Sequence, residues 1–199
     1  MPKETFLHLP SEKKQHIEEI LLENFYNRHI SQVKVSEIVE AMQMSRGAFY
    51  KYFQDLEDAY AYLIKKYSMV IHGEILQAIS KNKQDFFAGI ETFLIRCSQA
   101  DPNSHHWRML LFLTQSNNVE MSRRRPVSSD SPMVKQWLEL LALNQFDMTT
   151  TEEALSFLYF VMALVMGTLT DCMTNQWTTA QVLQEFQFRK KWLLHGIKH

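Results

Sequence analysis

Apolar residues recur at the spacing of an α-helix along most of this 199-residue chain, and no stretch alternates with a period of two. Ile17, Ile20, Leu21 and Phe25, for example, follow i, i+3, i+4 and i+8 spacing, which places them on one face of a helix. The chain also holds only 5 Gly and 5 Pro, whereas a β-rich chain needs many turn residues. These features together predict an all-α fold.

Capping residues suggest where several of these helices begin. We expect Ser11 to cap a helix over residues 11–28, and Asp55 to cap a long helix that ends near residue 79. Ser131-Pro132 is typical of a helix start, and Thr150 to Glu153 forms a T-x-x-E capping box. The other helices are expected over 35–42, 46–52, 86–94, about 103–115, 151–174 and from Thr178 or Thr179, with a loop over 117–131.

Residues 34–60, KVSEIVEAMQMSRGAFYKYFQDLEDAY, have the pattern of a helix-turn-helix. Val35 and Ile38 give its first helix an inward face, and Ser45 can cap its second helix. Gly47 is expected to let one backbone approach another, and the cations and small residues around it suit phosphates and base edges. We therefore expect an N-terminal three-helix DNA-binding domain over residues 1–66. A long helix joins it to a helical ligand-binding and dimerisation domain over residues 67–199.

This segment resembles the TetR family of bacterial transcriptional regulators over about residues 11–60. Three positions depart from the family pattern, because Lys34 replaces a threonine that caps the first helix, Gln43 replaces the glycine of the turn, and Phe49 replaces a leucine. The second change predicts a more strained turn. The matching residues are Val35, Ile38, Ser45, Gly47, Tyr50, Tyr52 and Phe53.

The resemblance implies a homodimer, formed by the last two helices, that binds a near-palindromic double-stranded operator. Two recognition helices would then enter successive major grooves about 34–36 Å apart. Arg46 and Ala48 are candidates for base reading, while Tyr50 and Lys51 are expected to hold phosphates. The full set of expected DNA-facing residues is Lys34, Ser45, Arg46, Gly47, Ala48, Tyr50 and Lys51.

The resemblance also implies that a small molecule binds the C-terminal domain and releases the repressor from its operator. The 13 Phe, 4 Trp, 7 Tyr and 11 Met suit an adaptable apolar cavity, although an ordinary core explains most of them. A drug-like or lipid-like effector is one reading, and a regulator without any small-molecule effector is another. The candidate effector residues are Met69, His72, Ile75, Leu76, Phe93, Arg96, Trp107 and Arg108.

His72 is a polar residue on a stripe that contains Met69, Ile75 and Leu76, and its ordinary role would be that of a hydrogen-bonded core histidine. The start MPK, the run RGAFYKYFQDLEDAY and the pair Ile71-His72 also resemble haem-sensing TetR-type repressors of haem-efflux operons. That resemblance implies that His72 is an axial ligand of haem iron. The second histidine of that group has no counterpart, since residues 151–174 contain none.

Other classes of protein lack support in the sequence. No nucleophile elbow, P-loop, HExxH motif or paired acid motif suggests an enzyme, and no cofactor is required. The eight His do not have metal-ligand spacing, and Cys97 and Cys172 form no disulfide framework. The uncharged segment 154–170 is short for a membrane span and lacks basic flanks, so we expect a buried helix, no membrane partner and a cytoplasmic location.

Overall fold

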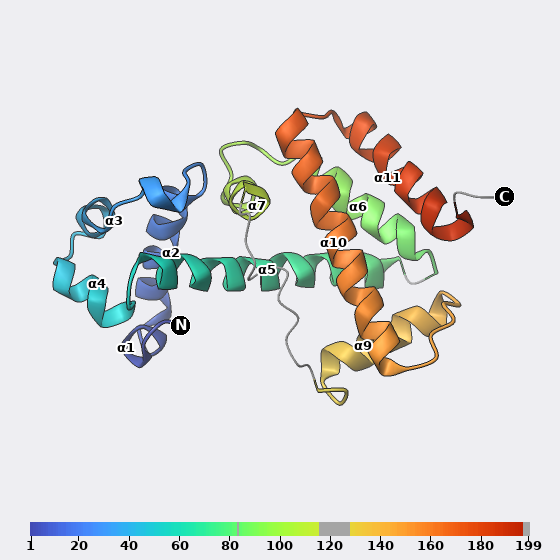
Figure 1. The fold of residues 1–199 in the computed structure, drawn as a ribbon, viewed down its shortest axis with the longest axis horizontal. Helices are drawn as coiled ribbons and strands as arrows, with labels where there is room; N and C mark the ends of the chain where they lie inside the picture. The colour runs from blue at the N-terminus through green and yellow to red at the C-terminus, as the bar shows by residue number, and fades with distance from the viewer. Residues whose placement is uncertain (83, 116–127, 197–199) are drawn as a thin grey trace. The chain divides into compact units, whose positions relative to one another are not determined.

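The computed structural model describes residues 1–82, 84–115 and 128–196. Every regular element in these ranges is helical, and they contain no strand, which confirms the predicted all-α class. The chain divides into two compact units (Figure 1), and helix α5, Leu56–Lys81, contributes to both of them. The first unit comprises residues 1–69 and 102–122, and the second comprises residues 70–101 and 123–199.

The first unit is built around two helices that pack on α2, Ser11–Phe25. These are α3, Val35–Ala41, and α7, His105–Gln115. The helix α4, Arg46–Tyr52, packs against α3 on one side and against the short α1, Glu4–Leu7, on another. A 3-10 turn at Ile30–Gln32 and the first part of α5 complete the unit.

The second unit is a helical bundle in which α6, Phe86–Ser98, packs against both α10, Thr151–Asn175, and α11, Thr179–His195. The helix α9, Pro132–Leu143, packs against α10. The indole Nε1 of the buried Trp137 donates a hydrogen bond of 2.7 Å to the carbonyl oxygen of Ala154, which ties α9 to α10. The polar end of this large side chain is therefore satisfied inside the core.

Most of the predicted helix starts are confirmed. Ser45, Ser131, Thr150 and Thr178 cap their helices by accepting a hydrogen bond from a backbone N–H three residues on. Asp55 likewise accepts one, of 2.7 Å, from the N–H of Asp58.

The prediction for Ser11 is wrong, because Pro10 occupies the capping position and Ser11 is already helical. Pro10 has an extended ψ of 142° and its carbonyl oxygen accepts a hydrogen bond of 3.0 Å from the N–H of Lys14, so it is the residue directly before the helix. The helix α1 and the 3-10 turn were not predicted. The predicted loop 117–131 lies mostly outside the described residues.

The compact units differ from the predicted domains in two places. The first difference is the boundary within α5, which falls after Met69 and not after Lys66. Lys66 binds the carboxylate of Glu18 on α2, so its side chain belongs to the packing of the first unit. The second difference is that residues 102–122, expected in the C-terminal domain, join the first unit through α7.

The helix α10 is long and apolar enough to cross a membrane by length and composition alone. Its inward residues Leu158, Val161, Val165 and Leu169 are buried within the second unit. A core helix of a bundle passes the same test, so this feature is weak evidence for a membrane span.

Candidate DNA-binding site

The helix-turn-helix consists of α3, a tight turn and α4. Ile38 of α3, Phe49 in the middle of α4 and Phe53 directly after α4 are fully or almost fully buried, which fixes the two helices on the core. Gln43 in the turn adopts a left-handed conformation with φ of 51°. A residue with a Cβ is disfavoured there, so the strain predicted from the absence of glycine is present.

The predicted DNA-facing residues lie on and just before α4, apart from Lys34 at the start of α3. All are exposed except Ala48, which is half-buried. The guanidinium of Arg46 lies 6.0 Å from the centroid of the Tyr50 ring, one helical turn further along. Within the described part of the chain, the side chains of Arg46 and Lys51 form no ion pair, so both cations remain free for an anionic partner.

Gly47 does not allow a close approach by any other described element of the chain. Outside its chain neighbours and its own helix backbone, a Cβ added to it would meet only the Ser45 hydroxyl oxygen among the described residues, at 3.8 Å. The expectation that Gly47 allows two backbones of this chain to approach each other is therefore wrong.

Two capping residues behave as expected from the sequence. Lys34 occupies the capping position of α3 but its side chain makes no capping hydrogen bond, as expected from the replaced threonine. The Ser45 hydroxyl accepts a hydrogen bond of 3.3 Å from the N–H of Ala48, so it fixes the start of α4.

A buried charged cluster, which was not predicted from the sequence, joins α2 to α5 in the unit that contains the helix-turn-helix. Glu18 of α2 is only 4% exposed, and its two carboxylate oxygens accept hydrogen bonds from Tyr62 and Lys66 of α5. Burial, followed by the hydrogen bond to Glu18, raises the pKa of Tyr62 well above its usual range. The cluster ties α2 to α5, and removing one partner would leave a buried charge uncompensated.

The predicted effector residues do not gather within one unit. Met69, Trp107 and Arg108 belong to the first unit, while the others belong to the second. Met69 is 66% exposed, so its predicted inward orientation is wrong, because it lies beyond the buried stripe of α5 that includes Ile71 and Ile75. Arg108 binds the carboxylate of Glu23 on α2 and so holds α7 to the first unit.

In the second unit, Ile75 and Phe93 are buried, and His72 and Leu76 are half-buried. Burial lowers the pKa of His72, so its imidazole is favoured in the neutral form that can bind a metal. No group of three or more potential metal ligands is found among the described residues. Arg96 binds Glu74 at 2.7 Å and lies 5.4 Å from the centroid of the Phe93 ring.

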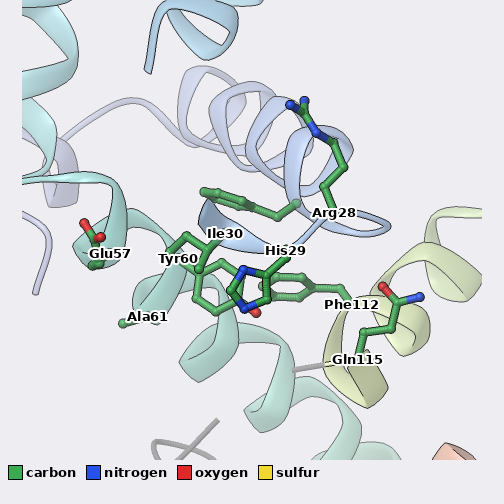
Figure 2. Close-up of a pocket in the computed structure, with 9 residues that line it drawn as sticks. Arg28, His29, Ile30, Glu57, Tyr60, Ala61, Phe112 and Gln115 are labelled. Carbon is green, nitrogen blue, oxygen red and sulfur yellow. The ribbon is translucent and has the colours of Figure 1, made fainter. Parts of the chain in front are cut away.

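The first unit also contains a cavity of about 520 Å³, which Figure 2 shows. Three of its walls are aromatic rings from α2, α5 and α7, and the Tyr60 centroid lies 5.1 Å from that of Phe25 and 5.2 Å from that of Phe112. None of the predicted effector residues lines it. Its lining residues are Phe25, Arg28, His29, Ile30, Glu57, Tyr60, Ala61, Phe112 and Gln115.

A helix-turn-helix with free cations, joined by one long helix to a helical bundle, defines a class of helical DNA-binding regulators. Residues 85–197, more than half of the chain, match the family model described as the tetracycline repressor-like C-terminal domain. The chain therefore belongs to the TetR family of transcriptional regulators. No relative was found among curated proteins.

Solved structures with this fold share little sequence with the chain. FadR of Bacillus halodurans, a fatty acid degradation regulator, is 16% identical with a TM-score of 0.53, over 96% of this chain and 99% of that chain. A TetR family regulator from Chloroflexus aurantiacus is 19% identical with a TM-score of 0.47, over 96% of this chain and 90% of its own. A TetR regulator from a Rhodococcus species is 14% identical with a TM-score of 0.49, over 94% and 97% respectively.

Proposed function

We propose that the chain is a homodimeric transcriptional repressor that binds a near-palindromic operator through α4. The observation that carries the proposal is the exposed face of α4, where Arg46 and Lys51 form no ion pair with any residue that the structure describes and the exposed Tyr50 ring lies beside Arg46. Cations on such a helix bind phosphates, and arginine can also bind guanine. We propose no catalytic activity, and a cytoplasmic location where DNA is accessible.

The proposed dimer forms through α10 and α11. Two aromatic residues of α11, Phe188 and Trp192, are 45% and 47% exposed in the single chain and stack with centroids 6.4 Å apart. Phe160 of α10 is similarly exposed. Exposed aromatic side chains on neighbouring helices are typical of the buried centre of an interface.

The experiment that tests operator binding is selection of bound sequences from a random double-stranded library, followed by anisotropy measurements on the selected site. We expect two half-sites about one helical turn apart, and a dissociation constant that Arg46→Ala increases by roughly tenfold or more. Arg96→Ala is the matched control, because Arg96 lies in the second unit and is bound to Glu74. Selection of no common sequence would contradict the proposal.

We propose further that a hydrophobic effector releases the operator, with α5 as the element that transmits the change. The support is that α5 is one continuous helix that contributes to both compact units. A displacement of the part of α5 in the second unit would therefore change the position of the part that packs in the unit of the helix-turn-helix. Unchanged operator affinity at a saturating concentration of a bound effector would count against release.

Haem is a second candidate, favoured by the half-buried, neutral imidazole of His72 and by the resemblance to haem-sensing repressors. The measurement is a haem titration of the purified protein, followed by its Soret absorbance, with His72→Ala and the exposed His16→Ala as a matched pair. A saturable band that only His72→Ala removes supports haem. A band indifferent to His72 directs the search to drug-like and lipid-like molecules, or to regulation without a small molecule.

A further inference from the structure

The N-terminal segment of residues 3–6 is bound to the end of the recognition helix α4. The backbone N–H of Lys3 donates a hydrogen bond of 2.8 Å to the carbonyl oxygen of Tyr52. The Lys3 ammonium donates another, of 2.7 Å, to the carbonyl oxygen of Tyr50. The Thr5 hydroxyl donates a third to the carbonyl oxygen of Lys51.

These three carbonyls are groups that a helix cannot satisfy by itself. The last four carbonyl groups of an α-helix have no partner within the helix. In α4 they belong to residues 49–52, and the N–H of Phe53, just beyond the helix, binds the first of them at 2.9 Å. Residues 3 and 5 bind the other three. The segment therefore completes the hydrogen bonding of α4 at its C-terminal end.

Phe6 anchors this segment in the core of the first unit. Its side chain is fully buried, and its ring centroid lies 4.8 Å from that of Phe53 and 5.2 Å from that of Tyr62. The ammonium of Lys14 lies 5.5 Å from the same centroid. Because Phe6 packs on Phe53 and Tyr62, displacement of the whole segment from α4 would expose an aromatic ring.

We propose that residues 3–6 form a clamp that positions the recognition helix for DNA. The clamp holds the backbone of Tyr50 and Lys51, the residues expected to contact phosphates. If the last turn of α4 frays, these side chains occupy several positions. Operator binding must then order the turn again, which lowers the affinity. Lys3 and Thr5 are positioning residues that act through α4. This inference rests on the proposed operator binding.

The test uses the full-length protein with both side-chain donors removed, Lys3→Met together with Thr5→Val. Hydrogen exchange of the free protein should show amides of residues 50–53 exchanging about tenfold faster, because the last turn of α4 opens more often. Operator affinity should fall by about tenfold with an unchanged dependence on salt, since no phosphate contact is lost. Lys3→Arg with Thr5→Ser restores the donors and should recover both properties, and Lys135→Met on the exposed face of α9 is the control.

Two results would overturn the clamp, and in the first of them the salt slope shows whether Lys3 has another role. Unchanged exchange at residues 50–53 would show that the segment does not hold α4. Faster exchange with unchanged operator affinity would show that order in this turn is irrelevant to binding. A salt slope reduced by about one, with exchange unchanged, would make Lys3 a phosphate contact. If the unaltered protein selects no operator, the proposed function fails, and the exchange measurement still decides whether the segment holds α4.

Discussion

Replacing Gly47 with alanine separates a structural role of this residue from a role at the DNA surface. Gly47 is the second residue of α4, and a methyl group there would meet only the Ser45 hydroxyl, at an ordinary contact distance of 3.8 Å. Alanine favours the helix over glycine by about 0.5–1 kcal/mol. The free energy of unfolding should therefore rise by about that amount, which corresponds to roughly 1–4 °C in Tm for a chain of this size.

The same methyl group should weaken operator binding. It stands on the exposed surface between Arg46 and Ala48, where the proposed complex brings the helix against the DNA. Since each subunit of a dimer would carry the obstruction, we expect the dissociation constant to rise by at least tenfold. Thermal unfolding and fluorescence anisotropy on the selected operator measure the two effects in one protein.

Gly73→Ala is the matched control. Gly73 lies in the middle of α5, and an added Cβ has no atom within 4 Å. Its replacement should give a similar gain in stability and leave operator affinity unchanged. Operator binding by Gly47→Ala as tight as that of the unaltered protein would refute the assignment of this surface to DNA, and a loss of stability would refute the packing argument.

Three further substitutions test other parts of the structure. Gly89→Ala should destabilise the chain by about 1–3 kcal/mol in chemical denaturation, because the added Cβ would lie 2.5 Å from the Cα of Ile79. An unchanged denaturation midpoint would contradict the close contact between Gly89 and Ile79. Gln43→Gly should stabilise the chain by about 0.5–1 kcal/mol, since the strain energy relieved at the left-handed φ exceeds the entropy that glycine adds to the unfolded chain. A loss of stability would show that the turn is not strained. Burial lowers the pKa of His72, so the stability held above a pH of about 6.5 should decline as pH falls and the unfolded state takes up the proton. His72→Gln should flatten this decline in denaturation series between about pH 7 and 5, and an identical profile would contradict the burial of a neutral imidazole.

The parts of the fold that depend on neighbouring residues could be predicted from the sequence. Ser45, Ser131 and Thr178 cap their helices because a hydroxyl reaches an amide three residues on, which is a local relation. The bounds of α4 follow from such a cap and from the aromatic residues at its end. The exposed residues of α4 could also be predicted, because the periodicity of a short amphipathic helix indicates which of its side chains face outward.

The helix α1 could not be predicted in this way. It has four residues, too few for a periodic pattern, and a helix of that length is unstable by itself. What fixes it is the burial of Phe6 and the three hydrogen bonds to α4, all of which join residues more than forty positions apart. A single aromatic residue between Thr5 and Leu7 forms no periodic pattern that would predict this role.

The placement of α7 shows the same limit at the level of the candidate site. Its bounds were close to those predicted, but its unit was not, because Phe112 packs on the rings of Phe25 and Tyr60 and Arg108 binds Glu23. These contacts place Arg108 in the first unit, and Arg96 in the second unit likewise forms an ion pair, with Glu74. The predicted set therefore reduces, within the second unit, to residues on α5 and α6 around His72, and effector variants there are the ones that can separate ligand binding from the integrity of the DNA-binding unit.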